Sequence, residues 1–288
     1  MAAITAQMVK ELREKTGAGM MDCKKALQEV GGDPEKAVDW LRQKGIAKAA
    51  KKSGRATAEG LVGVKASADG QVTALASLYC ETDFVARGEK FQEELQKIAQ
   101  AILDKNPKDQ AALQELCGDD VNQLIATIGE NMKIGDFERH EKGSDREAVG
   151  HYIHANGKIG VLVWAELGQA ANVTTETCTT LLRELAMQIA ATNPMAVDAN
   201  GVDPAAVERE REVYLQKARD EGKPENIVTK IAEGAVAKFK RSMCLLDQPY
   251  IRDDKKPVSE VIKEAAKTLN DTIKVLGYKR IQLTANEE

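Results

Sequence analysis

The 288-residue sequence is 43% hydrophobic and 30% charged, which suffices for two or three compact units that each bury a core. Its net charge of −4 argues against a surface coated with the Lys and Arg that polyanion binding requires. Five cysteines, odd in number and without a C-x-x-C pair, indicate neither a disulfide framework nor a zinc site. No signal-type run or apolar stretch near ~18 residues occurs, so we expect a soluble, cytoplasmic protein with no membrane contact.

Three short helices are predicted at the N-terminus. Apolar residues recur at helical spacing from Ile4 to Leu12, and Gly17 follows as a helix end. A second helix is predicted over about 20–30, before a pair of glycines. Asp33-Pro34 then supplies an N-cap and a first helical residue for a third helix. These elements predict a compact three-helix bundle.

The N-terminal region is basic and the rest of the chain is acidic. Residues 1–55 contain 12 Lys and Arg against 7 Asp and Glu, about +5, which leaves about −9 for the remainder. The basic segment 44–55 has no clear apolar stripe, so it fits a linker or a helix tail. We therefore expect a domain of residues 1–55 that suits an acidic partner surface.

Two turn signals recur in the middle of the chain at one spacing. Asp69-Gly70 and Asn106-Pro107 return as Asn156-Gly157 and Asn193-Pro194, each displaced by 87 residues (156 − 69 and 193 − 106). Asx-Gly pairs favour tight β-hairpins, and the apolar positions between the turns keep register. The pattern predicts two copies of one unit, each a hairpin followed by a helix. The predicted helices span about 83–103 and 175–192, and the second hairpin has strands near 148–155 and 158–167.

A helical hairpin is predicted to interrupt the second copy. Asp203-Pro204 is a helix start, and a Gly-Lys-Pro turn divides the segment 203–243 into two helices with a narrow apolar stripe. We expect an antiparallel coiled coil. The tail predicts a helix over about 258–269 and a last strand at either 273–276 or 279–283. The predicted domains are thus 1–55, 56–145 and 146–288.

The sequence offers little for covalent chemistry. His151 and His154 are separated by an odd number of residues in a predicted strand, so their side chains point to opposite faces and do not suit one metal ion. No glycine-rich nucleotide-binding motif and no nucleophile with a nearby base are present. We therefore expect a protein that is not an enzyme and that holds no metal or cofactor.

Two segments allow both a structural and a functional interpretation. Met20 and Met21 are adjacent at a helix start, so they either fill gaps in a small core or present an adaptable surface to a partner. In Thr82-Asp83-Phe84-Val85, Asp83 suits an N-cap and Phe84 a core residue of the first turn. The functional alternative is an aromatic wedge on a rigid turn beside an acidic side chain.

The sequence resembles the bacterial elongation factor Ts family, the guanine-nucleotide exchange factors of elongation factor Tu. The resemblance covers nearly the whole chain. It depends on LREKTGAGMMDCKKAL at 12–27, TDFVA at 82–86, HANGKIGVLV at 154–163, GKP and EG within 222–234, and QPY at 248–250. Some relatives carry an additional C-terminal helical module, which this sequence does not show.

The resemblance implies an α+β fold with a ubiquitin-associated-like N-terminal bundle, two duplicated core subdomains and an inserted coiled coil. It also implies three contacts with elongation factor Tu. The magnesium and phosphate region would meet the exchange wedge Thr82, Asp83, Phe84 and Val85. The nucleotide domain would meet Leu12, Arg13, Met20 and Met21, and the third domain would meet His154. Self-association as a homodimer stays open.

Two other functions stay open from the residues alone. A helical-bundle adaptor would bind acidic or ubiquitin-like proteins through residues 1–55 without exchange activity, and Phe84 would then be dispensable. RNA binding through 44–55 is less favoured, because that segment lacks the interleaved aromatic residues on which bases stack. We expect no direct contact with nucleic acid.

Overall fold

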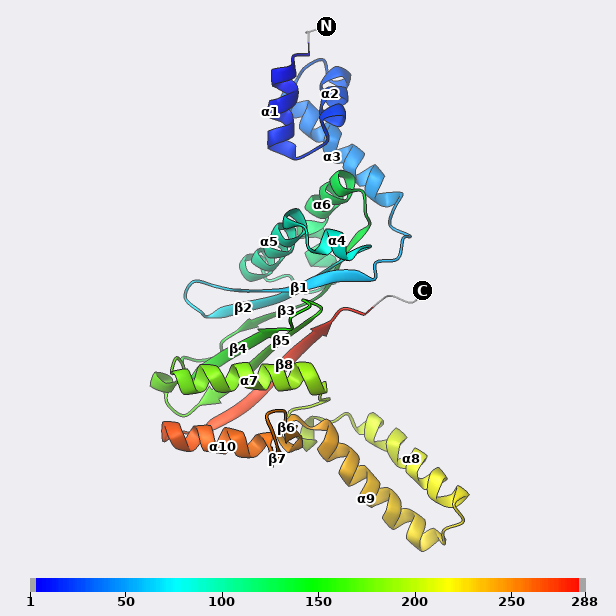
Figure 1. Cartoon of the computed structure of the whole chain (residues 1–288), viewed down its shortest axis with the longest axis vertical. Coiled ribbons are helices and arrows are strands. Elements are labelled where there is room, and N and C mark those ends of the chain that lie inside the picture. The colour runs from blue at the N-terminus through cyan, green and yellow to red at the C-terminus, as the bar shows by residue number, and fades with distance from the viewer. Residues whose placement is uncertain (1–3, 285–288) are drawn as a thin grey trace. The chain divides into compact units, whose positions relative to one another are not determined.

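The computed structural model describes residues 4–284, which form a mixed α and β structure. The chain divides into two compact units, each with helices packed against a three-stranded sheet (Figure 1). The first unit runs to Glu141 and also includes Ala155–Gly160 and the chain from Ile281. The second unit comprises Lys142–His154 and Val161–Arg280.

The first unit begins with three helices, α1 (Ala6–Thr16), α2 (Met20–Glu29) and α3 (Pro34–Ala50). The predicted caps are present: Gly17 has a φ of 65° and ends α1, and the Asp33 carboxylate accepts hydrogen bonds from the backbone N–H groups of Glu35 and Lys36. The basic segment continues α3, so its interpretation as a helix tail is confirmed through Ala50. The bundle encloses a core of its own, made of Val9, Leu12, Cys23, Ala26, Leu27, Ala37 and Leu41.

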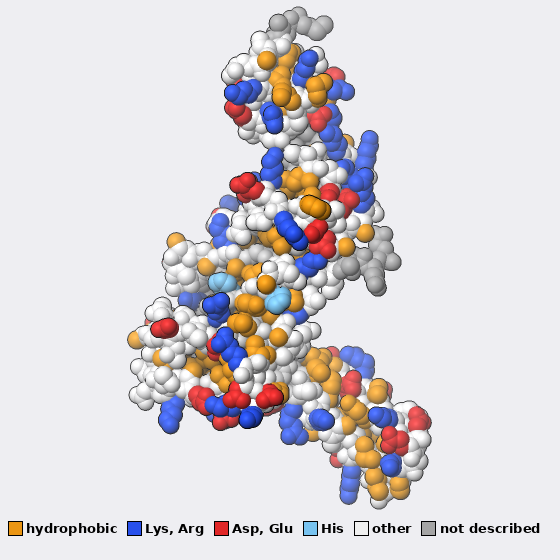
Figure 2. Space-filling model, in the orientation of Figure 1, with side chains coloured by type: hydrophobic (Ala, Val, Ile, Leu, Met, Phe, Trp, Pro, Cys, Tyr) orange, Lys and Arg blue, Asp and Glu red, His pale blue; other side chains and the backbone are white. Residues whose placement is uncertain are grey.

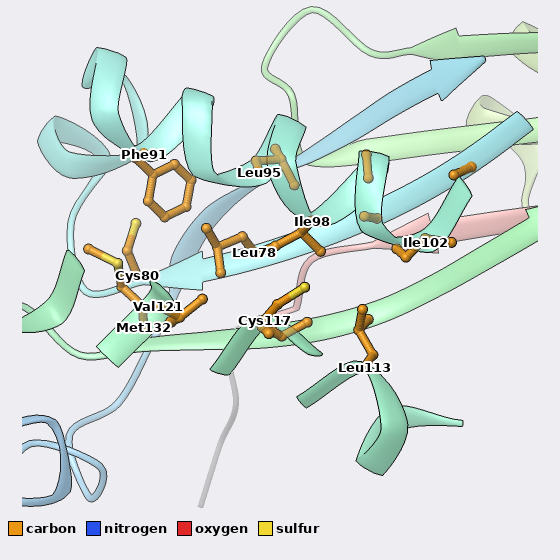
Figure 3. Packing of buried hydrophobic residues seen from close by; sticks show 14 of the residues in the cluster. Leu78, Cys80, Phe91, Leu95, Ile98, Ile102, Leu113, Cys117, Val121 and Met132 are labelled. Atoms are coloured by element: carbon orange, nitrogen blue, oxygen red, sulfur yellow. The ribbon is translucent and has the colours of Figure 1, made fainter. Parts of the chain in front are cut away.

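The sheet of the first unit is antiparallel with the order β1-β2-β3. Its elements are β1 (Glu59–Ala66), β2 (Val72–Cys80), α4 (Asp83–Ala86), α5 (Glu89–Lys105), α6 (Gln110–Ile128) and β3 (Met132–Glu141). Side chains of α5 and α6 pack against β2 and β3 in the core, with Phe91, Leu78 and Ile98 fully buried (Figure 3).

Sequence reasoning found β1, β2 and α5 but overlooked α6 and β3. The prediction of one helix over 83–103 was wrong at its start. The chain forms the single turn α4 and then begins α5 after Gly88, whose extended backbone (φ −68°, ψ 139°) interrupts the helix.

Within the described residues, the second unit contains the sheet β4-β5-β8 and four α-helices, two of which form a hairpin. Its elements are β4 (Glu147–Ile153), β5 (Ile159–Leu167), α7 (Glu176–Thr192), β6 (Pro249–Tyr250), β7 (Asp253–Pro257), α10 (Val258–Leu269) and β8 (Ile273–Gln282), with short 3₁₀ helices η1 (Ala170–Asn172), η2 (Ala199–Gly201) and η3 (Leu245–Asp247). The last strand is continuous, so it joins most of the two segments that were predicted as alternatives.

The repeated turn signals adopt matching backbone conformations. Gly70 and Gly157 both have positive φ, 68° and 71°, in the β1–β2 and β4–β5 turns. Asn106 and Asn193 end α5 and α7 in the left-handed region, with φ of 47° and 45°. Asparagine tolerates this region better than most residues, which accounts for its use at both helix ends.

Two helices, α8 (Pro204–Asp220) and α9 (Glu225–Met243), form a helical hairpin in the second unit. Asp203 caps α8 as predicted, and Val228 and Ala232 of α9 are fully buried. Other hydrophobic side chains of the hairpin, including Val213 and Ile227, remain exposed along its surface (Figure 2). Within residues 4–284, no helix is both long and apolar enough to cross a membrane.

Candidate functional site

The Thr82–Val85 segment forms a rigid turn directly after β2. Thr82 has an extended backbone (φ −127°, ψ 153°), and its hydroxyl accepts a hydrogen bond from the Val85 N–H at 3.4 Å. Thr82 is therefore the N-cap, and the prediction that Asp83 fills this position was wrong. Asp83 is instead the first residue of α4, and its carboxylate pairs with Arg87 one turn later at 3.0 Å.

Phe84 is presented to solvent at the centre of this turn. Its side chain is 87% exposed, whereas Ala86 is 3% exposed and Val85 packs against the core. Successive helical residues point about 100° apart, so a helix held through Val85 and Ala86 directs Phe84 away from the core. The interpretation of Phe84 as a core residue was wrong, and the exposed aromatic side chain is the observation that needs a function.

Residues distant in sequence hold the turn in place. The Glu130 carboxylate accepts hydrogen bonds from the Thr82 N–H at 3.0 Å and from the Thr82 hydroxyl at 2.7 Å. The Glu81 carboxylate accepts the Asn131 N–H at 2.6 Å and pairs with Arg55 at 3.4 Å. Sequence reasoning overlooked Glu130 and Asn131, because no local pattern links them to a turn about 50 residues earlier.

The cysteine beside the turn is buried and hydrogen-bonded within the turn. Cys80 is fully buried, and its thiol donates a hydrogen bond to the Thr82 carbonyl at 3.2 Å. Burial, together with the nearby Glu130 carboxylate, raises the pKa of the Cys80 thiol to about 12. A thiol with that pKa stays protonated at neutral pH, so Cys80 supports the turn through packing.

The N-terminal bundle exposes three of its four predicted contact residues. Met20 and Met21 are 56% and 75% exposed, and Arg13 is also exposed. The interpretation of both methionines as core residues was therefore wrong. Leu12 is 3% exposed and belongs to the bundle core, so its contact with a partner stays a prediction. Leu12 faces inward because its position repeats the helical spacing of Val9.

The methionine-bearing start of α2 is held against α3 by ion pairs. The Asp22 carboxylate accepts hydrogen bonds from the Lys44 and Lys48 ammonium groups, both at 2.7 Å. These hydrogen bonds from Lys44 and Lys48 lower the pKa of Asp22 below its ordinary value of 3.8. Lys44 and Lys48 thus hold Asp22, the residue that follows Met20 and Met21, against α3.

His154 lies in the second unit, at the end of β4. Its side chain is exposed, and Nδ1 lies 3.2 Å from the Tyr152 hydroxyl. The two rings meet edge to face, with centroids 6.1 Å apart. Among residues 4–284, no group of three or more His, Cys, Asp or Glu side chains is arranged to hold a metal ion.

Comparison with known proteins identifies the family. A family model described as Elongation factor TS matches residues 81–285. Elongation factor Ts of Desulfovibrio desulfuricans is 63% identical over 285 residues, which cover 99% of this chain and 100% of that protein. Elongation factor Ts of Nitratidesulfovibrio vulgaris is 56% identical over 281 residues, with 98% and 96% covered. A matched segment of this length and relatives of this identity show that the chain belongs to the elongation factor Ts family.

Proposed function

We propose that the chain promotes GDP release from elongation factor Tu by inserting Phe84 beside the partner's magnesium and phosphate site. Membership of the family makes it a guanine-nucleotide exchange factor that supports translation elongation. The observation that carries the proposed mechanism is the 87% exposure of Phe84 on a turn fixed at both sides. Asp83, the adjacent carboxylate, is the group proposed to act near the cation.

The free energy that exchange requires is of the size that one buried aromatic ring can largely supply. A factor that prefers the nucleotide-free partner must weaken nucleotide binding by the same ratio, and a thousandfold ratio corresponds to about 4 kcal/mol. Burial of one phenyl ring contributes roughly 1.5–3 kcal/mol. The remainder must come from distortion of the magnesium shell, which tolerates little departure from octahedral geometry, and from the other contact surfaces. No covalent step is needed.

Two further surfaces are proposed to bind the same partner. Met20, Met21 and Arg13 would contact the nucleotide domain of elongation factor Tu, because exposed thioethers adapt to a partner's shape. His154 would contact its third domain. We also propose that the N-terminal bundle is ubiquitin-associated-like, that the core subdomains 56–145 and 146–288 are duplicates, and that α8 and α9 form a coiled coil.

Stopped-flow release of a fluorescent GDP analogue from elongation factor Tu tests the mechanism. At fixed magnesium, we expect acceleration by the wild-type protein that falls at least about tenfold in Phe84→Ala, equivalent to ~1.4 kcal/mol. Asp83→Asn keeps an amide oxygen in place of the carboxylate and removes the charge. Unchanged exchange in Asp83→Asn would refute an electrostatic role and leave a role in holding the turn.

The alternative is an adaptor that binds acidic or ubiquitin-like proteins through residues 1–55. The observation that favours it is the separate closed core of the N-terminal bundle. It predicts binding without exchange and no effect of Phe84→Ala. If the wild-type protein fails to accelerate GDP release, this alternative takes first place.

RNA binding through the basic segment has less support than either alternative. Lys44 and Lys48 are paired with Asp22, and Arg55 is paired with Glu81. Lys52 donates a hydrogen bond to the carbonyl of Gly129. Contacts within the chain thus engage much of the charge that a phosphate backbone would need.

A further inference from the structure

The orientation of Phe84 depends on contacts outside its own helix. α4 has four residues, which is too short to be stable by local hydrogen bonds alone. Val85 and Ala86 fix one face of the helix on the core. These contacts leave the N-terminal end of α4 to be fixed by other groups, because the chain turns sharply there from β2 into the helix.

Glu130 fixes that end through both carboxylate oxygens. Oε2 accepts the Thr82 N–H at 3.0 Å, and Oε1 accepts the Thr82 hydroxyl proton at 2.7 Å. Since the hydroxyl donates to Glu130, its lone pair is directed to the Val85 N–H at 3.4 Å. One carboxylate thus orients the N-cap and, through it, the first turn that carries Phe84.

The loop that carries Glu130 also holds the segment that follows α3. The Asn131 side chain donates hydrogen bonds to the Arg55 carbonyl at 2.7 Å and to the Ser53 carbonyl at 3.3 Å. Asn131 is 7% exposed, so these bonds lie in a mostly buried environment. The loop of residues 129–131 therefore contacts both the segment after α3 and the turn before α4, and its backbone has little freedom to shift.

We infer that Glu130 is a positioning residue for nucleotide exchange, which holds Thr82 so that Phe84 projects in the orientation the partner meets. The inference rests on the proposed function of Phe84. Glu130 is not offered as a partner contact. Its effect on exchange should therefore depend on the presence of the phenyl ring.

A double-mutant cycle tests this dependence. We would measure stimulated GDP release from elongation factor Tu, as maximal rate and as the concentration for half-maximal rate, with wild type, Glu130→Ala, Phe84→Ala and the double variant. Glu130→Ala should lower the maximal rate at least about fivefold. It removes two hydrogen bonds to a charged carboxylate, and such bonds contribute more free energy than bonds between neutral groups, so the orientation of Thr82 is lost. In the Phe84→Ala background the same change should cost less than twofold.

Matched variants separate positioning from loss of fold. Thr82→Val removes the hydroxyl at constant size and should reproduce the loss, whereas Thr82→Ser keeps the hydroxyl and should restore exchange. Glu115→Ala removes an exposed carboxylate from α6 and should leave exchange within twofold of wild type. Thermal unfolding of every variant, followed by circular dichroism, identifies any that fail to fold.

Two results would overturn the inference. Equal losses from Glu130→Ala with and without Phe84 would mean that Glu130 acts on folding or on the partner directly. Wild-type exchange rates in both Glu130→Ala and Thr82→Val would mean that the hydrogen bonds between Glu130 and Thr82 are not needed for exchange. If Phe84→Ala alone has no effect, the proposed function fails first, and that arm of the cycle distinguishes the two failures.

Discussion

Phe84 and Phe91 allow one substitution to be compared at an exposed and a buried position. Phe91 is fully buried in the core cluster, so Phe91→Ala should lower the free energy of unfolding by about 3–5 kcal/mol. Phe84 is 87% exposed, so folding buries only 13% of it (100 − 87). At 1.5–3 kcal/mol for full burial, Phe84→Ala should lower the free energy of unfolding by only ~0.2–0.4 kcal/mol.

The remaining 87% of the Phe84 surface is available to the partner. If the partner covers all of it, the ring contributes about 1.3–2.6 kcal/mol of binding free energy. Where that contact forms only with the nucleotide-free partner, its loss lowers stimulated GDP release roughly 9-fold to 80-fold. Phe84→Ala should therefore damage exchange while it leaves stability nearly unchanged.

Urea unfolding, followed by circular dichroism, and stopped-flow GDP release on the same preparations check both halves of this prediction. For exchange, Phe91→Ala serves as the control for nonspecific damage at a temperature where it remains folded. The reasoning is refuted if Phe84→Ala lowers the free energy of unfolding by more than about 1 kcal/mol, since an exposed ring cannot supply that much. It is also refuted if exchange by Phe84→Ala equals that of wild type.

Three further predictions concern the scaffold. The pKa of Asp22 is lower in the folded than in the unfolded state, so its ion pairs stabilise the fold above the unfolded pKa, and this stability is lost as pH falls through the folded pKa. Asp22→Asn should therefore lower the melting temperature at pH 7. It should also make the fall of the melting temperature on acidification smaller than in wild type. Asn106→Gly should leave stability nearly unchanged, whereas Asn106→Ala and Asn193→Ala should each cost about 1 kcal/mol in urea unfolding, since both positions have positive φ. All five cysteines are buried, and burial raises the pKa of Cys80 to about 12 and that of Cys178 to about 11. The thiols should therefore react with a thiol reagent at pH 8 far more slowly in native than in denatured protein. Rapid labelling of the native protein would contradict the buried placement.

Local signals in the sequence predicted a large part of the fold. Caps such as Asp33 and Asp203 and the left-handed Asn106 and Asn193 are set by neighbouring backbone groups, so their positions could be read directly. The hairpin turns were equally local. The break at Gly88 was not predicted, because the apolar periodicity continues across it and only the extended backbone of the structure reveals it.

Sequence reasoning named Phe84, the exposed residue of the candidate site, but not Glu130 and Asn131, which hold its turn in place. Phe84 was singled out because it lies in the TDFVA motif at 82–86. Its exposure could not be decided from the sequence, because an aromatic residue in the first turn of a helix fits a core equally well. Glu130 and Asn131 follow α6, a helix that was not predicted, and their roles arise from tertiary contacts. Leu12 shows the reverse case, a motif residue whose side chain belongs to the core.

Nucleotide exchange by differential binding requires an arrangement that is rigid before the partner arrives. If the loop became ordered only in the complex with the nucleotide-free partner, the cost of ordering it would weaken that complex alone and would reduce the preference on which exchange depends. In this chain the exposed ring lies on a single helical turn that is fixed by Val85 and Ala86 on one side and by Glu130 at its start. The residues around Phe84 therefore stabilise the turn, while its ring stays exposed and, in the proposed mechanism, free to contact the partner.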